Sequence, residues 1–209
     1  MTLTTLLLFL GASLALTIAP GPDNIFVITQ GIARGRRAAI VTAWGMCSGI
    51  TVHTLAAAAG ISAVFYSSAI AFQVVKYAGA AYLLYLAWQA LREGGPLALS
   101  TAGIAAGPSG LALFRRGFIM NVLNPKVALF FLAFLPQFVA REAGNVPLQM
   151  VVLGLLFMAQ ALVIFTLIGI FSGSVGGWLQ RRPRVGRQFS WLAAGVFAAL
   201  GIRLALAER

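Results

Sequence analysis

The sequence predicts an all-α polytopic membrane protein with six transmembrane helices, of which the first and the fourth are broken at proline motifs. Among its 209 residues, 60% are hydrophobic and only 9% are charged, and the mean hydropathy is +0.94. A soluble domain carries about 25% charged residues. No charge occurs between Arg37 and Lys76 or between Glu142 and Arg181, and apolar runs of about 18 or more residues are typical of membrane-spanning helices.

Six apolar segments follow one another along the chain. The first is long for a hydrocarbon core of about 30 Å, so we expect a break and a tilt to absorb the excess length. No Lys or Arg precedes it, whereas a cleavable signal peptide begins with basic residues, so we expect it to be retained as a helix. Five spans are the alternative if the last segment, which contains Arg203, does not cross. The expected spans are Leu3–Gly31, Ala38–Val64, Ala69–Leu91, Leu111–Leu135, Leu148–Ser172 and Phe189–Leu206.

The charge pattern predicts how these spans are oriented. Basic residues cluster in the three loops after the odd-numbered spans, and such loops lie in the cytoplasm of polytopic membrane proteins. Both termini are then expected to be periplasmic. The clustering also explains the net charge of +11 without a nucleic-acid partner. The loop arginines are Arg34, Arg36 and Arg37, then Arg92, Arg115 and Arg116, then Arg181, Arg182, Arg184 and Arg187.

The chain is expected to form one transmembrane domain, residues 1–209, made of two three-helix halves. Residues 1–92 form the first half and residues 111–209 the second, joined by a cytoplasmic linker over residues 93–110 that is rich in Gly, Pro, Ser and Ala. Because each half holds an odd number of spans, related halves must insert with opposite orientations. We therefore expect a 3+3 inverted repeat.

The first interruption places two prolines and a carboxylate inside an apolar run. Proline removes a backbone donor, and glycine allows a ligand or another backbone to approach closely. A bare carboxylate in the membrane costs at least about 2.5–3.5 kcal/mol, so Asp23 needs a partner, water or a proton. It can cap the restarting helix, bind substrate or a proton, or do both; Asn24 can bind a substrate carboxylate or bridge the break. The motif is Ala19-Pro20-Gly21-Pro22-Asp23-Asn24.

The second interruption, halfway along the chain, carries the opposite charge. Lys126 can form an ion pair with Asp23 or attract a substrate carboxylate, and the structural alternative is snorkelling to an interface. We expect Asn121 to bond freed backbone groups or to line a cavity. Paired broken helices in the two halves of a membrane protein indicate a transport site. The motif is Asn121-Val122-Leu123-Asn124-Pro125-Lys126.

The remaining reactive side chains are few. His53 is the only histidine and Cys47 the only cysteine, which leaves no cysteine pair for redox chemistry and no histidine-built metal site. We expect no cofactor. His53 lies near the centre of the second span, where it can form an interhelical hydrogen bond or relay protons. Gly45 and Gly49 have the small-xxx-small spacing that permits close helix approach.

These motifs resemble the signature of the LysE/RhtB family of amino-acid exporters. The first break with Gly31, Gly35, Arg36 and Arg37 looks like one family motif, and the second break with Gly117-Phe118 is similar to another. The resemblance implies a six-span inner-membrane protein of bacterial type that exports amino acids using the proton gradient, with a homodimer as one option. Five residues match the motif positions: Asp23, Asn24, Asn121, Asn124 and Lys126.

The sequence therefore predicts a secondary transporter, not an enzyme, that exports amino acids or related small zwitterions by proton antiport and alternating access. Asp23, Lys126, His53 and the asparagines are the candidate substrate and proton site, shaped by Pro20, Gly21, Pro22 and Pro125. A metal-ion or other small-solute exporter and a non-transporting membrane assembly subunit remain alternatives. A P-loop that would indicate an ATP-driven pump does not occur in the sequence.

Overall fold

The computed structural model describes residues 1–19, 21–61, 69–92, 109–181 and 183–206, and these residues form helices joined by short turns. Pro20 and most of the expected linker lie outside the described residues. The elements are α1 (Leu3–Ile18), α2 (Pro22–Arg34), α3 (Arg36–Ala56), the π-helical turn η1 (Ala57–Ile61), α5 (Ala69–Arg92), α6 (Gly110–Val122), α7 (Pro125–Leu129), the π-helical turn η2 (Phe130–Phe134), the 3-10 turns η3 (Leu135–Phe138) and η4 (Arg141–Ala143), α8 (Val146–Arg181) and α9 (Pro183–Leu206).

Both predicted helix breaks are confirmed. The chain bends by 54° between α1 and α2, and by 48° between α6 and the segment Pro125–Phe138. Pro22 and Pro125 each occupy the first turn of the restarting helix, where the missing N–H would have had no partner and the fixed φ suits a helix start. Each proline thus stops one helix and begins the next.

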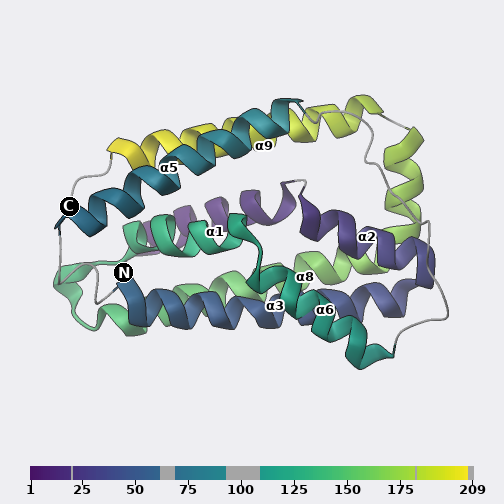
Figure 1. The fold of residues 1–209 in the computed structure, drawn as a ribbon, viewed down its shortest axis with the longest axis horizontal. Helices are drawn as coiled ribbons and strands as arrows, with labels where there is room; N and C mark the ends of the chain where they lie inside the picture. The colour runs from purple at the N-terminus through teal and green to yellow at the C-terminus, as the bar shows by residue number, and fades with distance from the viewer. Residues whose placement is uncertain (20, 62–68, 93–108, 182, 207–209) are drawn as a thin grey trace.

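The helices are arranged in layers that run along the long axis of the molecule (Figure 1). The antiparallel pair α5 and α9 forms one outer layer, and α3 packs against both α6 and α8 on the other side. The bent α1–α2 segment contacts α3, α8 and α9. The two breaks therefore lie inside the molecule, between the outer layers.

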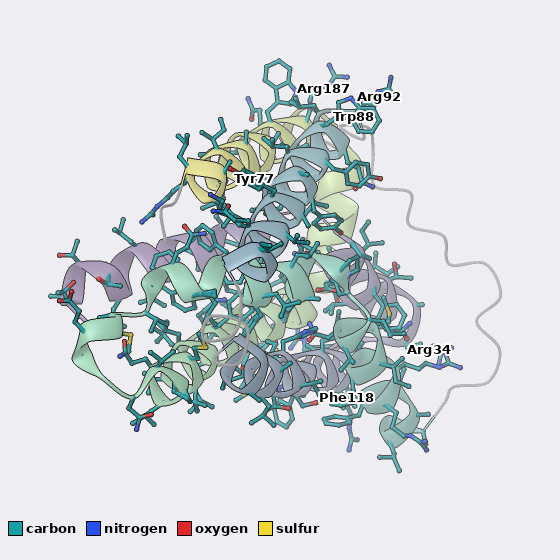
Figure 2. The ribbon with its side chains drawn as sticks, turned by 60° about the vertical axis from the view of Figure 1, so that its left-hand side comes forward. Arg34, Tyr77, Trp88, Arg92, Phe118 and Arg187 are labelled. Atoms are coloured by element: carbon teal, nitrogen blue, oxygen red, sulfur yellow. The ribbon has the colours of Figure 1, made fainter. Side chains whose placement is uncertain are left out.

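The basic segments lie at one end of this arrangement. The α2–α3 junction, the start of α6 and the start of α9 lie at the right of Figure 1, and the start of α1 and the end of α9 lie at the left. At the basic end of the α5–α9 layer, Trp88, Arg92 and Arg187 gather in Figure 2. The Arg92 guanidinium lies 4.5 Å from the centre of the Trp88 ring. The described basic segments thus lie at the opposite end from the start of α1 and the end of α9, and which end faces the cytoplasm stays a prediction.

The number of membrane spans is confirmed only in part. Two helices of the described chain, Arg36–Gly60 and Val146–Ser172, are long and apolar enough to cross a bilayer, and each bent pair adds one span if it is counted as a unit. The shorter apolar helix Ser190–Leu206 falls below that length. The structure thus supports two to four spans of a multi-pass membrane protein, and six spans remain a prediction.

Small residues allow the central helices to pack closely. A Cβ atom at Gly45 of α3 would overlap the carbonyl group of Phe114 on α6, and one at Gly117 of α6 would overlap the Thr42 carbonyl on α3. A Cβ at Gly154 of α8 would overlap the Thr54 side chain. The small-xxx-small spacing around Gly45 therefore serves the α3–α6 contact, as such spacing does in other membrane helices.

A cluster of phenylalanines fills the space beside the second break. Phe130 is fully buried and its ring lies 5.4 Å from that of Phe157 and 6.1 Å from that of Phe9. Phe131 lies 5.2 Å from Phe157, and Phe138 lies 5.3 Å from Phe9. These rings join η2 and η3 to α1 and α8.

Candidate functional site

The first break exposes carbonyl groups that side chains from elsewhere satisfy. In a continuous helix the Leu16 carbonyl would accept from residue 20, but Pro20 has no N–H. The Lys126 ammonium donates to that carbonyl at 3.1 Å and to the Ala19 carbonyl at 3.4 Å. The Asn24 amide donates to the Thr17 carbonyl at 3.0 Å. Three carbonyls at the end of α1 are therefore paired by side chains, as an apolar environment requires.

The carbonyl that proline frees at the second break is also paired by other groups. Pro125 removes the N–H that would bond the Asn121 carbonyl. That carbonyl accepts instead from the Asn124 N–H at 2.9 Å and lies 3.0 Å from His53 Nε2. Asn124 caps α7, because its Oδ1 accepts from the Lys126 N–H at 2.9 Å. Of the two roles open to His53, the structure contains the interhelical hydrogen bond, and a role in proton relay stays a prediction.

The two breaks meet at a buried pocket. Its cavity volume is about 10 Å³, which is room for about one water molecule in this conformation. Asp23 and Lys126 both line this pocket and are 3% and 6% exposed. Their opposite charges attract each other. The lining residues are Leu16, Thr17, Asp23, Ile50, Asn121, Lys126, Val127, Phe157 and Phe165.

Several buried polar atoms around the breaks have no hydrogen-bond partner. They are four acceptors, the Oδ1 atoms of Asp23, Asn24 and Asn121 and the Oε1 atom of Gln160, and one donor, Asn124 Nδ2. Buried polar groups in proteins are nearly always paired, so each exception needs an explanation such as water, an ion or a ligand. The excess of acceptors suits a ligand or solvent molecule that donates hydrogen bonds.

Three sequence-based interpretations are corrected by this geometry. Capping of α2 by Asp23 or Asn24 is wrong, because Gly21 is the N-cap and α2 has no side-chain cap hydrogen bond. Snorkelling of Lys126 is also wrong, because its ammonium is buried against α1. The hydrogen bonds of that ammonium go to carbonyl groups, so an Asp23–Lys126 hydrogen-bonded pair does not describe this conformation, although both groups line one pocket.

The structure adds partners that the sequence reasoning missed. Gln160 Nε2 donates to Thr17 Oγ1 at 2.9 Å, which ties α8 to the end of α1. Gly21 brings the backbone close to the Lys126 ammonium, since a Cβ there would lie 3.0 Å from Nζ. The Leu16 and Asn121 carbonyls could have been found from the sequence, because each lies four residues before a proline. Their partners depend on tertiary packing and carry no local signal.

Known proteins resemble this chain along nearly all of its length. The family profile of the LysE type translocators matches residues 14–208. A homoserine/homoserine lactone efflux protein of Salmonella typhimurium (strain LT2) is 29% identical over 96% of this chain and 95% of its own length. A leucine efflux protein of Enterobacter sp. (strain 638) is 28% identical over 91% and 90%, and a membrane protein of Vibrio cholerae serotype O1 is 30% identical over 97% of each chain. No solved structure matches the chain.

Proposed function

The chain belongs to the LysE family of translocators, and we propose that it exports amino acids with uncharged side chains from the cytoplasm through the pocket between the two breaks. The observation that carries this proposal is the pair of buried opposite charges, Asp23 and Lys126, that line one pocket at two broken helices. Two relatives are named as efflux proteins, one for homoserine or homoserine lactone and one for leucine, and homoserine and leucine are amino acids with uncharged side chains.

The pocket lining suits a neutral zwitterion. Its charged groups are one carboxylate and one ammonium, so a ligand that carries one charge of each sign leaves the site with no net charge. The rest of the wall is mostly apolar, with Ile50, Phe157 and Phe165 among the lining residues. A cationic or anionic side chain would need a further partner, because a charge left unpaired in an apolar site is costly. Amino acids such as lysine or glutamate are therefore expected to be poor substrates.

The pocket is too small for an amino acid in this conformation, so transport requires it to open. We infer that the two halves move against each other, as related halves do in alternating access. Both breaks place a proline at the first helical position and a charge directly after it, Pro22-Asp23 in one half and Pro125-Lys126 in the other. This correspondence supports the proposed inverted repeat.

Efflux against a gradient needs an energy source, and we propose exchange for protons. Asp23 is the buried carboxylate at the site, and its Oδ1 atom has no hydrogen-bond partner. A group that gains and loses a proton inside a transport site can couple the two fluxes. The protein would then lie in a bacterial-type inner membrane with its basic loops in the cytoplasm.

Transport by purified protein in liposomes tests these proposals. Wild-type protein is expected to catalyse counterflow of leucine or homoserine and efflux driven by a pH gradient. Asp23→Asn should keep counterflow, which needs no net proton movement, and lose gradient-driven efflux. Glu142→Gln is the matched control, because Glu142 is an exposed carboxylate in the turn η4.

Two results would overturn these assignments. Unchanged pH-driven efflux in Asp23→Asn would eliminate Asp23 as the coupling carboxylate. Absence of counterflow for every amino acid tested with folded wild-type protein would remove the exporter function and favour the assembly-subunit alternative.

A further inference from the structure

The C-terminal end of α1 forms a cation site built from backbone carbonyls. Pro20 frees the Leu16 carbonyl, and the helix ends before the Ala19 carbonyl can be paired within it. The carbonyl end of a helix also carries a partial negative charge. In the interior of a membrane protein no bulk water can satisfy these groups, so a donor or a cation must lie there.

In this structure the occupant is the side chain of Lys126. Its ammonium carries three N–H donors, and two of them account for the hydrogen bonds to Leu16 and Ala19 at 3.1 and 3.4 Å. Gly21 leaves the space that the ammonium fills, since a Cβ there would lie 3.0 Å from Nζ. The lysine therefore reaches from the second half of the chain into a site formed by the first half.

The surroundings of this site are incomplete without a further donor. Asp23 and Asn121 line the same pocket, are 3% and 2% exposed, and each has an Oδ1 atom with no hydrogen-bond partner. The Lys126 ammonium is bonded to the carbonyls, and Asn124 Nδ2, the unpaired donor nearby, acts on the Asp23 carboxylate, so the donors at the site are fewer than its acceptors. A second ammonium, brought by a ligand, would supply the missing donors.

We propose that the Leu16 and Ala19 carbonyls form a binding site for a primary ammonium group, and that Lys126 occupies this site as a tethered competitor until a ligand's ammonium takes its place. The displaced lysine would then turn towards Asp23, whose carboxylate lines the same pocket. The inference rests on the proposed function only in identifying the ligand as an exported amino acid. If Lys126 instead attracts a substrate carboxylate, replacing it should not create a binding site for n-propylammonium.

Removing the competitor tests the site directly. Lys126→Ala leaves a space that n-propylammonium can fill, because this ion has the three carbons and the ammonium that the substitution removes. We expect n-propylammonium to bind purified Lys126→Ala in detergent at least about tenfold more tightly than wild type, because the site is vacant rather than mostly occupied. Binding is measured by titration calorimetry and by the shift in the unfolding temperature.

A milder variant and two further ions make the test specific. Lys126→Gln keeps a neutral donor of similar reach, so it should fold, and its affinity for n-propylammonium should lie between those of wild type and Lys126→Ala. If Lys126→Ala does not fold, the Lys126→Gln result decides. Tetramethylammonium, which has no N–H donor, and Na⁺ should bind all three proteins equally weakly.

The inference is overturned if neither variant binds n-propylammonium more tightly than wild type, or if Na⁺ or tetramethylammonium binds the variants as well as n-propylammonium does. These outcomes are independent of transport. If Lys126→Ala binds n-propylammonium but wild type shows no amino-acid counterflow, the ammonium site is supported and the exporter proposal is wrong. If wild type shows counterflow but neither variant binds n-propylammonium more tightly, the exporter proposal is supported and the ammonium site is wrong.

Discussion

The amide of Asn24 bridges the first break, and its removal should destabilise the fold by a definite amount. Asn24 Nδ2 donates to the Thr17 carbonyl at 3.0 Å, and the side chain is 6% exposed. In a continuous helix that carbonyl would accept from Gly21, but Gly21 lies outside α1 in an extended conformation. Asn24→Ala therefore leaves a buried carbonyl without its side-chain donor.

Two kinds of measurement set the range expected for the loss in free energy of unfolding. A buried polar group that loses its partner costs about 1–3 kcal/mol. Hydrogen bonds between membrane helices contribute less, about 0.6 kcal/mol on average and up to about 1.7 kcal/mol, because the chain finds other partners when it unfolds in the membrane. We expect Asn24→Ala to lower the free energy of unfolding by about 1–2 kcal/mol.

Reversible unfolding in mixed micelles containing dodecyl sulfate measures this loss. The matched control is Gln137→Ala, because Gln137 Nε2 also donates to a backbone carbonyl, that of Ala133 at 3.3 Å, from a half-buried position that water can reach. The control should cost less than Asn24→Ala. If Asn24→Ala is no less stable than wild type, or no less stable than the control, then the amide does not hold the break together.

Two further predictions concern packing and orientation. Gly45→Val should prevent the close α3–α6 contact and lower the yield of monodisperse protein, whereas Gly11→Val should have little effect because no atom lies within 4 Å of a Cβ at Gly11. Equal yields would contradict the packing argument. Arg37→Cys, made in a Cys47→Ser background, should react with a membrane-impermeant maleimide only from the cytoplasmic side, since Arg37 is exposed in the basic segment at the start of α3. Labelling from the periplasm would reverse the proposed orientation.

The sequence was most informative where local chemistry alone decides the structure. A proline removes one specific N–H wherever it stands, so Pro22 and Pro125 predicted both breaks correctly. The charges beside them in apolar runs predicted that Asp23 and Lys126 would be buried at a shared site. Both charges line one pocket, and their role in binding substrate or protons stays a prediction.

The sequence was least informative about partners and helix type. Whether Lys126 bonds to Asp23 or to the end of α1 depends on the depth at which the two breaks meet, which no local pattern encodes. The π-helical turn at Phe130–Phe134 was also not predicted. A run of consecutive apolar residues looks the same in an α-helix and in a π-helical turn, since every face is apolar and the period is hidden.

The carbonyl that proline frees at each break is contacted by a side chain from the other predicted half of the chain. Lys126, from the second half, bonds to the carbonyl that Pro20 frees in the first half. His53, from the first half, lies at the carbonyl that Pro125 frees in the second half. In the proposed alternating access, a relative movement of the two halves would stretch both contacts. A ligand that replaces the lysine ammonium would remove one of these two links, and the free energy of its binding would then favour the movement.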